Sequence, residues 1–277
     1  MPSAATDTDT DISGRRINAV GTTQPYSWWD ERESVDGLRQ LQHEIVRADS
    51  LEAWTALVRD HLSWGNTKIA SHVAIFNMNA ASDCPNLGTD FCQVDASECY
   101  ATTTEQWNKW ALPARRRQEY LWDHLDAHTF ARTIASLVET RRAHPNSGDP
   151  AATALRLNQA GDVRHRGDVI KANQIGQLLA DWVDVETYLY TASSWLDWHE
   201  LPTDHVTINA SNAQEPLASV ADRQYTAIDP DTDPASVSHL SDDARQCPYD
   251  ATDGEHKCGD CVMCVTDEAP DVYIETH

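Results

Sequence analysis

Apolar residues along the chain change between helical and strand-like spacing. Between residues 28 and 61 they recur three, four or six positions apart, as on one face of a helix, and Ser50 is suited to cap a second helix. The same periodicity predicts helices within 105–142, with Pro113 near a helix start, and over about 168–182. We interpret the first helices as a packing layer.

Short segments rich in β-branched and aromatic residues separate these helices. We expect strands within 68–79 and at 154–158, 186–191, 205–210 and 224–228. Strands that alternate with helices favour βα units around a parallel sheet. The pattern therefore predicts an α/β fold with a parallel sheet and N-terminal helices.

Composition divides the chain into four parts. Residues 1–24 are rich in Asp, Thr and Ser and are predicted to be disordered. Residues 25–245 carry the alternating elements and form the α/β domain. A cysteine-rich segment at 246–265 is expected to bind metal and to pack on this domain, and residues 266–277 are expected to form an acidic tail.

The formal net charge is −23, and only four of the 21 basic residues are lysines. We interpret this charge as an adaptation to the solvent and not as a sign of the protein's chemistry. Self-repulsion at such a charge destabilises the compact state at low salt. The Debye length falls from about 8 Å at physiological ionic strength to about 3 Å at 1 M. The sequence therefore favours a halophilic archaeal protein. An acidic protein that recruits basic partners is the alternative.

Neither a membrane span nor export is indicated. No apolar run approaches the roughly 20 residues that cross a bilayer, and the N-terminal residues are polar and acidic. We therefore expect a cytoplasmic protein without membrane partners. In that compartment clustered cysteines are more often metal ligands or catalytic groups than disulfides.

The seven cysteines form two groups, and the C-terminal group has the stronger motif. This group consists of Cys247, which precedes a proline, and Cys258, Cys261 and Cys264, which form a C-x2-C-x2-C run. Such a run turns three thiolates toward one point, as in ferredoxin-type [4Fe–4S] sites with a remote fourth cysteine before proline. Zinc held by four thiolates is the main alternative, and reduced structural cysteines are a third.

The first group is Cys84, Cys92 and Cys99, in the loop that follows the first predicted strand. Three thiolates leave one iron of a cubane cluster open to a small molecule. The spacing matches no common motif. Two alternatives to a cluster stay open for this group: zinc held together with a histidine such as His72, or no metal at all.

Several short motifs, in this order, resemble the "gene product 88" family of phage, plasmid and archaeal proteins. They are Gly-Asn-Thr-Lys-Ile at 65–69, the first cysteine group with Tyr-Ala at 100–101, Leu-Arg-Leu at 155–157, Gly-Asp at 161–162, Tyr-Thr-Ala-Ser at 190–193 and the C-terminal cysteine run. The resemblance covers roughly 60–265. The chain differs from the family in wider first-group spacing and in Ala192, where the family pattern has arginine.

The layout also resembles, more remotely, the radical S-adenosylmethionine enzymes. That resemblance implies a partial (βα) barrel in which Cys84, Cys92 and Cys99 hold the reactive cluster. It implies that Tyr100, Gly161 and Asp162 bind S-adenosylmethionine, and that the C-terminal cysteines hold an auxiliary cluster. Asp162 would accept a hydrogen bond from the ammonium of the cofactor.

Two functional hypotheses follow. The first is an iron–sulfur protein of a halophile, a radical-SAM-like enzyme of unknown substrate and unknown catalytic residues. The second is a non-enzymatic module, stabilised by zinc or a cluster, in virus or plasmid replication or other nucleic-acid transactions. Arginines cluster at 115–117, at 141–142 and at 164 and 166. Phosphate binding weakens steeply with salt, so we expect these arginines to pair with nearby carboxylates instead.

Overall fold

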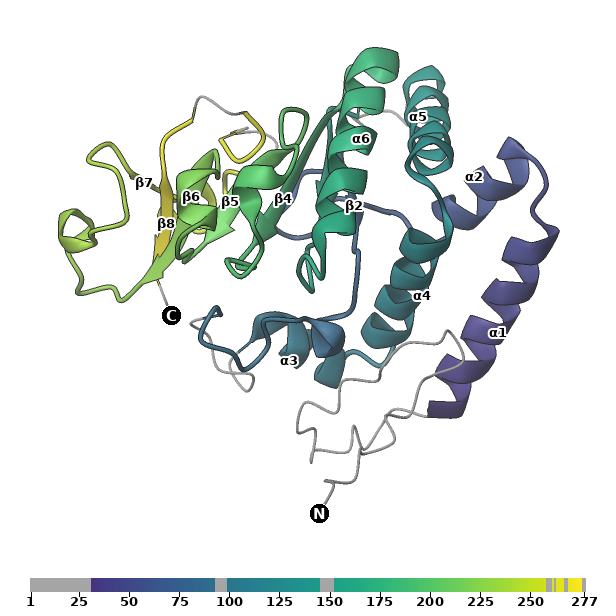
Figure 1. The fold of residues 1–277 in the computed structure, drawn as a ribbon, viewed down its shortest axis with the longest axis horizontal. Helices are drawn as coiled ribbons and strands as arrows, with labels where there is room; N and C mark the ends of the chain where they lie inside the picture. The colour runs from purple at the N-terminus through teal and green to yellow at the C-terminus, as the bar shows by residue number, and fades with distance from the viewer. Residues whose placement is uncertain are drawn as a thin grey trace.

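Figure 1 shows the fold of the computed structural model, which describes residues 31–92, 99–144, 152–257, 261, 263–266 and 269–275. For residues 31–36 only the backbone is described. The segment 1–24, predicted to be disordered, and Cys258 lie outside the described residues.

A mostly parallel sheet organises the molecule, as the sequence predicts. The strands are β1 (Ser63–Trp64), β2 (Val73–Phe76), β3 (Ala154–Leu157), β4 (Glu186–Thr191), β5 (Thr207–Ser211), β6 (Arg223–Ile228), β7 (Arg245–Gln246) and β8 (Val272–Glu275). Their order in the sheet is β1-β2-β3-β4-β5-β6-β8-β7, and only the β1–β2 pair is antiparallel. From β2 to β6, each strand therefore lies beside the one that precedes it in the chain.

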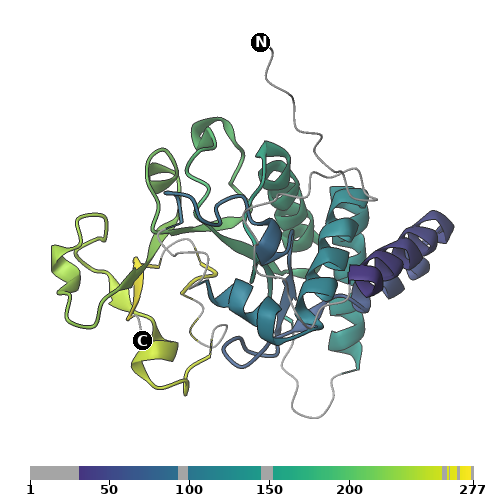
Figure 2. The ribbon, with the colours of Figure 1, turned by 90° about the horizontal axis from the view of Figure 1, so that it is seen from below.

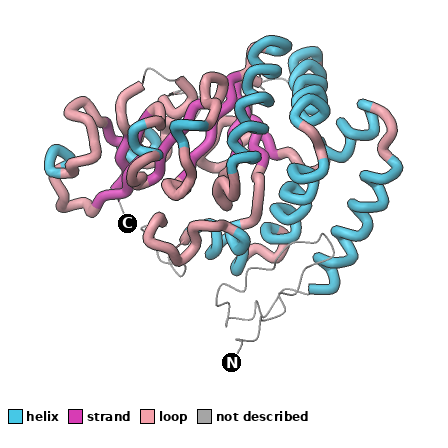
Figure 3. Tube along the Cα trace, in the orientation of Figure 1, coloured by secondary structure: helices cyan, strands magenta, loops and turns pink. Residues whose placement is uncertain are grey.

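The long helices gather beside the first half of the sheet, and mostly loops and short turns connect the later strands (Figure 3). The α-helices are α1 (Glu31–Arg47), α2 (Leu51–Arg59), α3 (Tyr100–Trp107), α4 (Ala111–His124), α5 (Ala127–Ala143), α6 (Arg166–Val183) and α7 (Pro248–Ala251). Four 3-10 helices are η1 (Ala81–Asp83), η2 (Trp198–Glu200), η3 (Leu217–Ser219) and η4 (Pro234–Ser236). Ser50 caps α2 by accepting a hydrogen bond from the Ala53 amide, as predicted.

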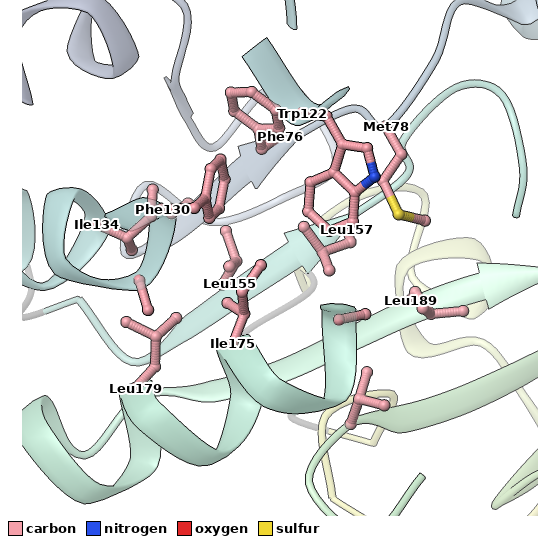
Figure 4. Packing of buried hydrophobic residues seen from close by; sticks show 14 of the residues in the cluster. Phe76, Met78, Trp122, Phe130, Ile134, Leu155, Leu157, Ile175, Leu179 and Leu189 are labelled. Atoms are coloured by element: carbon pink, nitrogen blue, oxygen red, sulfur yellow. The ribbon is translucent and has the colours of Figure 1, made fainter. Parts of the chain in front are cut away.

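One face of the sheet packs against α5 and α6 through a continuous apolar core (Figure 4). Phe76 of β2 meets Phe130 of α5 edge to face at 4.9 Å, and Trp122 of α4 meets the same ring at 5.6 Å. Ile175 and Leu179 of α6 are fully buried in this core. The helical periodicity of the sequence predicted these buried positions because burial follows the helix face.

The sequence pattern was wrong at the C-terminus of the sheet. Residues 266–277 were expected to form an acidic tail, but Val272–Glu275 pair with β6 as strand β8. The apolar run there is only three residues long and is flanked by acidic residues, so it gives a weak strand signal. The two-residue strands β1 and β7 leave no periodic signal and were also missed.

Among the described residues, no helix combines the length and the apolar character needed to cross a bilayer. This finding agrees with the absence of a long apolar run in the sequence.

Lys171 closes the corner between α4 and α5. Its ammonium donates hydrogen bonds to the carbonyls of Trp122 and Leu125 and lies 4.3 Å from the Trp122 ring centroid. Burial lowers the pKa of Lys171 to about 8, although nearby carboxylates such as Asp123 and Asp168 oppose that shift. The ammonium group therefore lies in a site whose burial disfavours its charged form.

This arrangement predicts a pH-dependent contribution to stability. Between about pH 8 and 10.5 the unfolded chain keeps the Lys171 proton and the folded chain releases it, so stability rises with pH. Relative to Lys171→Met, we expect the wild type to gain about 1–2 kcal/mol of unfolding free energy from pH 8 to 10. Denaturant unfolding of both proteins at constant high salt measures the difference. A difference that is flat, or that falls with pH, would contradict the burial of this charge.

Candidate functional site

The candidate site lies where β2, β3 and β4 end side by side. Since these strands are parallel, the loops that follow them leave from the same edge of the sheet, where ligands of open α/β sheets commonly bind. Helix α3 and the loop before it lie beyond this edge in Figure 1, and Figure 2 views the edge from below. The first cysteine group belongs to the loop after β2.

Asparagine side chains join the loop after β2 to the loop after β3. The side-chain oxygen of Asn77 accepts a hydrogen bond from the Ala160 amide at 2.8 Å. Asn79 binds the backbone of Asp162 twice, with its oxygen 2.9 Å from the amide and its nitrogen 2.6 Å from the carbonyl. In the opposite direction, Asn158 accepts from the Met78 amide at 3.0 Å. These bonds fix the two loops against each other without regular strand pairing.

Gly161 permits the close approach of the two loops. Its φ angle is +75°, and a Cβ atom there would lie 1.5 Å from Oδ1 of Asn79 and 2.7 Å from the Asn79 carbonyl oxygen. A side chain would therefore face both a disfavoured backbone conformation and a direct clash. The sequence motif Gly161-Asp162 marks a turn after β3 that only glycine fits.

Asp162 is the hub of this edge. Its Oδ1 accepts from the Val163 amide at 2.6 Å, and its Oδ2 accepts from Asn86 Nδ2 and the Ala192 amide, both at 2.8 Å. The side chain of Thr191 adds a further hydrogen bond. Burial raises the pKa of Asp162, and the hydrogen bonds hold that rise back. The carboxylate thus ties together the loops that follow β2, β3 and β4.

Asn86, Ser193 and Trp195 complete the network, and the sequence interpretation missed them as site residues. Asn86 Nδ2 also donates to the Ser193 hydroxyl at 2.8 Å, and the Trp195 indole donates to Asn86 Oδ1 at 3.1 Å. The Ser193 hydroxyl in turn donates to the Val163 carbonyl at 2.8 Å. The signal for such a site in the sequence was the presence of polar residues in the loops after buried strands.

Cys84 of the first cysteine group lies in the loop that Asn86 ties to this hub. Burial raises the pKa of Cys84 well above its usual value, and the charge of Asp162 adds to the rise, followed by those of Cys92 and Cys99. The loop after β2 therefore carries Cys84 to the Asp162 network. Cys84, Cys92 and Cys99 are all among the described residues, and they do not form a ready-made metal site there.

Glu105 positions the loop that carries Cys84. Its buried carboxylate accepts from the amides of Ala81 and Ser82 at 2.7 and 3.1 Å, at the start of η1. The same carboxylate pairs with Arg115 at 2.8 Å. Because Cys84 directly follows η1, this buried ion pair fixes the point from which the cysteine loop leaves.

Tyr100 lies at the first position of α3, directly after Cys99. Its hydroxyl donates a hydrogen bond to the Gln159 carbonyl, while the side chain is 61% exposed. The ring thus connects the cysteine loop with the turn that contains Gly161 and Asp162. His72 precedes β2, at the end of that strand opposite to the Cys84 loop, so it is not placed to complete the first group.

Cys264 of the C-terminal cysteine group lies on the sheet face that α5 and α6 leave uncovered. Cys264 and Val265 pack there against Val73, Ile75 and Tyr188. Burial raises the pKa of Cys247, and the charge of Cys261 adds to the rise. Among the described residues, no three histidine, cysteine, aspartate or glutamate side chains stand in an arrangement that holds a metal ion.

Side chains of β5 and β6 anchor this C-terminal segment. Arg223 donates to the carbonyls of Met263 and Thr266. Asn209 Nδ2 donates to the Cys264 carbonyl at 3.0 Å, and the Thr207 hydroxyl donates to the Val265 carbonyl at 2.8 Å. These hydrogen bonds hold the segment through its backbone carbonyls.

The clustered arginines form ion pairs and hydrogen bonds within the fold. Arg164 pairs with Asp123 at 2.6 Å, Glu119 at 3.1 Å and Asp168 at 3.2 Å. Arg166 pairs with Glu200, and Arg142 donates to the backbone carbonyls of Val183 and Ala152. Pairing with carboxylates was expected, but of these ion pairs only that between Arg164 and Asp168 joins residues four positions apart, and Arg164 precedes α6. Most partners are distant in sequence.

Comparison of the chain with models of known protein families, with curated proteins and with solved structures finds no significant match. The function is therefore argued from the residues of the site.

The turn after β3 provides a stability test with an internal control. We expect Gly161→Ala to lower the free energy of unfolding by about 3 kcal/mol or more, because the methyl group meets Asn79 in addition to the backbone strain. Gly88 also has a positive φ, +70°, but nothing lies within 4 Å of a Cβ there. Gly88→Ala should cost only about 1 kcal/mol. Equal losses in denaturant unfolding would contradict the close approach.

Proposed function

We propose that this protein is an iron–sulfur protein whose first cluster is held by Cys84, Cys92 and Cys99, and that it acts as a radical-SAM-like enzyme. The observation that carries the proposal is the position of the Cys84 loop beside the Asp162 network, at the carboxyl edge of β2, β3 and β4. The sequential strand order supports a partial (βα) barrel. The resemblance to the "gene product 88" family leaves the substrate open.

The donor set fits a thiophilic metal. Three cysteines belong to the segment between β2 and α3, and the burial of Cys84 beside Asp162 disfavours its thiolate unless a cation compensates the charge. When bound, a cluster with one iron not held by cysteine supplies electrons and an open coordination position for S-adenosylmethionine. The chain itself supplies a fixed turn at Gly161, the exposed ring of Tyr100 and a buried anion, Asp162, that compensates positive charge beside the thiols.

The role of Asp162 in this proposal differs from the one implied by the resemblance. Both of its oxygens are engaged by protein donors, among them Asn86 and the Ala192 amide. We therefore propose that Asp162 acts mainly by orienting the loops and through its charge. The ammonium of the cofactor would then be received by groups at the surface of the network, such as the carbonyls of the 159–162 turn.

The second cysteine group suits a structural or auxiliary metal. The backbone around Cys264 is fixed on the sheet by Arg223, Asn209 and Thr207, as expected of a segment that completes the fold. This observation also favours the second candidate function, a non-enzymatic module stabilised by zinc or a cluster. A role in nucleic-acid transactions draws little support from the arginines, because their guanidinium groups pair within the protein.

Metal and sulfide content test the proposal on full-length protein purified anaerobically in high salt. We expect iron and acid-labile sulfide with a broad absorbance near about 400 nm, the property of thiolate-bound clusters. Cys84→Ala/Cys92→Ala/Cys99→Ala should lose one portion of the iron, and Cys247→Ala/Cys261→Ala/Cys264→Ala the other. S-adenosylmethionine should change the EPR signal of the reduced cluster only when the first group is intact.

Three outcomes separate the candidates. Stoichiometric zinc without colour would leave the non-enzymatic module and remove the enzyme. An iron content that does not fall in the first triple variant, together with complete loss in the second, would place the cluster in the C-terminal group alone. An EPR signal of the wild type that does not respond to S-adenosylmethionine would remove the cofactor while keeping the iron–sulfur assignment.

A further inference from the structure

A pocket of about 330 Å³ lies at the end of the sheet opposite to the cysteine loop. It is lined by Trp64, Gly65, Asn66, Ile69, Ala70, Ser71, His72 and Lys257. Ser71 and His72 precede β2, whereas Cys84 follows it. Since a strand rises about 3.3 Å per residue, the length of β2 separates the two regions. The volume lies near the lower limit of small-molecule sites, about 300–1,000 Å³.

The wall of this pocket is preformed. Gly65 has a φ angle of +61°, and a Cβ there would meet the carbonyl oxygens of Ala70 and Ile69 at 2.6 and 2.7 Å. The Asn66 side chain accepts from the amides of Lys68 and Ile69, both at 2.8 Å. The loop is therefore held in one shape by its own hydrogen bonds, and a ligand meets no large ordering cost there.

The pocket differs in charge from the rest of the chain. None of its eight lining residues is acidic, although the protein carries 44 aspartates and glutamates. Lys257 contributes one of only four lysines, and the buried His72 contributes an imidazole. The Arg141 guanidinium stacks on Trp64 at 4.5 Å and donates to the Ser71 carbonyl at 3.0 Å. An anion is therefore the ligand that this pocket suits.

Trp64 adds a flat apolar wall beside the cationic groups. The indole is half-buried and held in place by the stacked Arg141. Aromatic side chains bind nucleobases by stacking, worth about 1–3 kcal/mol per base, and this contact does not depend on charge. At multimolar salt, where the attraction of Lys257 for a phosphate is screened, such a contact retains its strength. A phosphate joined to a base satisfies both parts of the pocket.

We propose that this pocket binds a nucleoside monophosphate, with the phosphate at Lys257 and His72 and the base against Trp64. Lysine binds phosphate as a point charge, and an imidazole N–H adds a directional donor. The volume restricts the ligand to a mononucleotide rather than a longer nucleic acid. The site is separate from the first cysteine group, and Lys257 directly precedes the C-terminal cysteine run.

Calorimetric titration of the full-length protein in multimolar KCl tests the pocket. We expect saturable binding, one ligand per chain, for at least one of AMP, GMP, CMP and UMP. Inorganic phosphate and the nucleoside of the bound nucleotide are titrated separately, and each should bind more weakly than the nucleotide. Lys257→Glu and Ser71→Glu change exposed residues of the wall and should weaken binding about tenfold or more.

Lys109→Glu is the matched control, since it makes the same charge change at an exposed residue beside Trp110, outside the pocket. It should bind the nucleotide as the wild type does, and circular dichroism should show all variants folded. The proposal is overturned if none of the four nucleotides binds at millimolar concentration. It is equally overturned if both pocket variants bind as tightly as Lys109→Glu.

Discussion

The burial of one carboxylate constrains the whole carboxyl edge of the sheet. An ionised carboxylate removed from water is tolerated only when hydrogen bonds replace its hydration. Asp162 obtains them from the Val163 and Ala192 amides, from Asn86 and from Thr191. These donors belong to the loops after β2, β3 and β4 and to the end of β4 itself, so satisfying the one anion brings those segments together. Cys84 lies two residues from Asn86 and is carried to the hub by the same bond.

The two faces of the sheet follow different chemistry. The face toward α5 and α6 is a continuous apolar core that includes Phe76, Leu155 and Leu189. The other face carries apolar residues such as Val73 and Ile75 on β2, and polar and aromatic side chains on later strands that include Arg156, Tyr190 and Arg223, with Arg156 stacked on Tyr190 at 4.6 Å. A polar face is stable only when its donors and acceptors are satisfied. The backbone carbonyls of the C-terminal segment meet that need on the β5–β6 half, which is why this segment packs there.

The strand–helix alternation and the helix faces were predictable because burial imposes periods of two and 3.6 residues on the sequence. Phe130, Ile134 and Ile175 are buried as their spacing indicates. The resemblance led us to expect the first three cysteines near Gly161 and Asp162, and the structure brings the loop of Cys84 to Asp162 through Asn86. The roles of Asn79 and Asn86 were not predictable, because the cited hydrogen bonds join residues that are 76 to 107 positions apart. No periodicity encodes such pairs, and the short apolar run of strand β8 lies among acidic residues that hide its signal.

Strand β4 separates the two cysteine groups while it contacts both. Successive residues of a strand point to opposite faces. Thr191 turns to Asp162 and thereby to the first group, whereas Tyr190 points to the face where Cys264 lies. Burial raises the pKa of Tyr190, and the charge of Cys264 adds to the rise. The Tyr190 ring packs against the cluster that contains Cys264. One group thus lies at the edge of the sheet and the other on its face. In the part of the chain that the structure describes, the Cys84 loop and Cys264 are thus fixed by different hydrogen bonds, the first through Asn86 to Asp162 and the second through its carbonyl to Asn209.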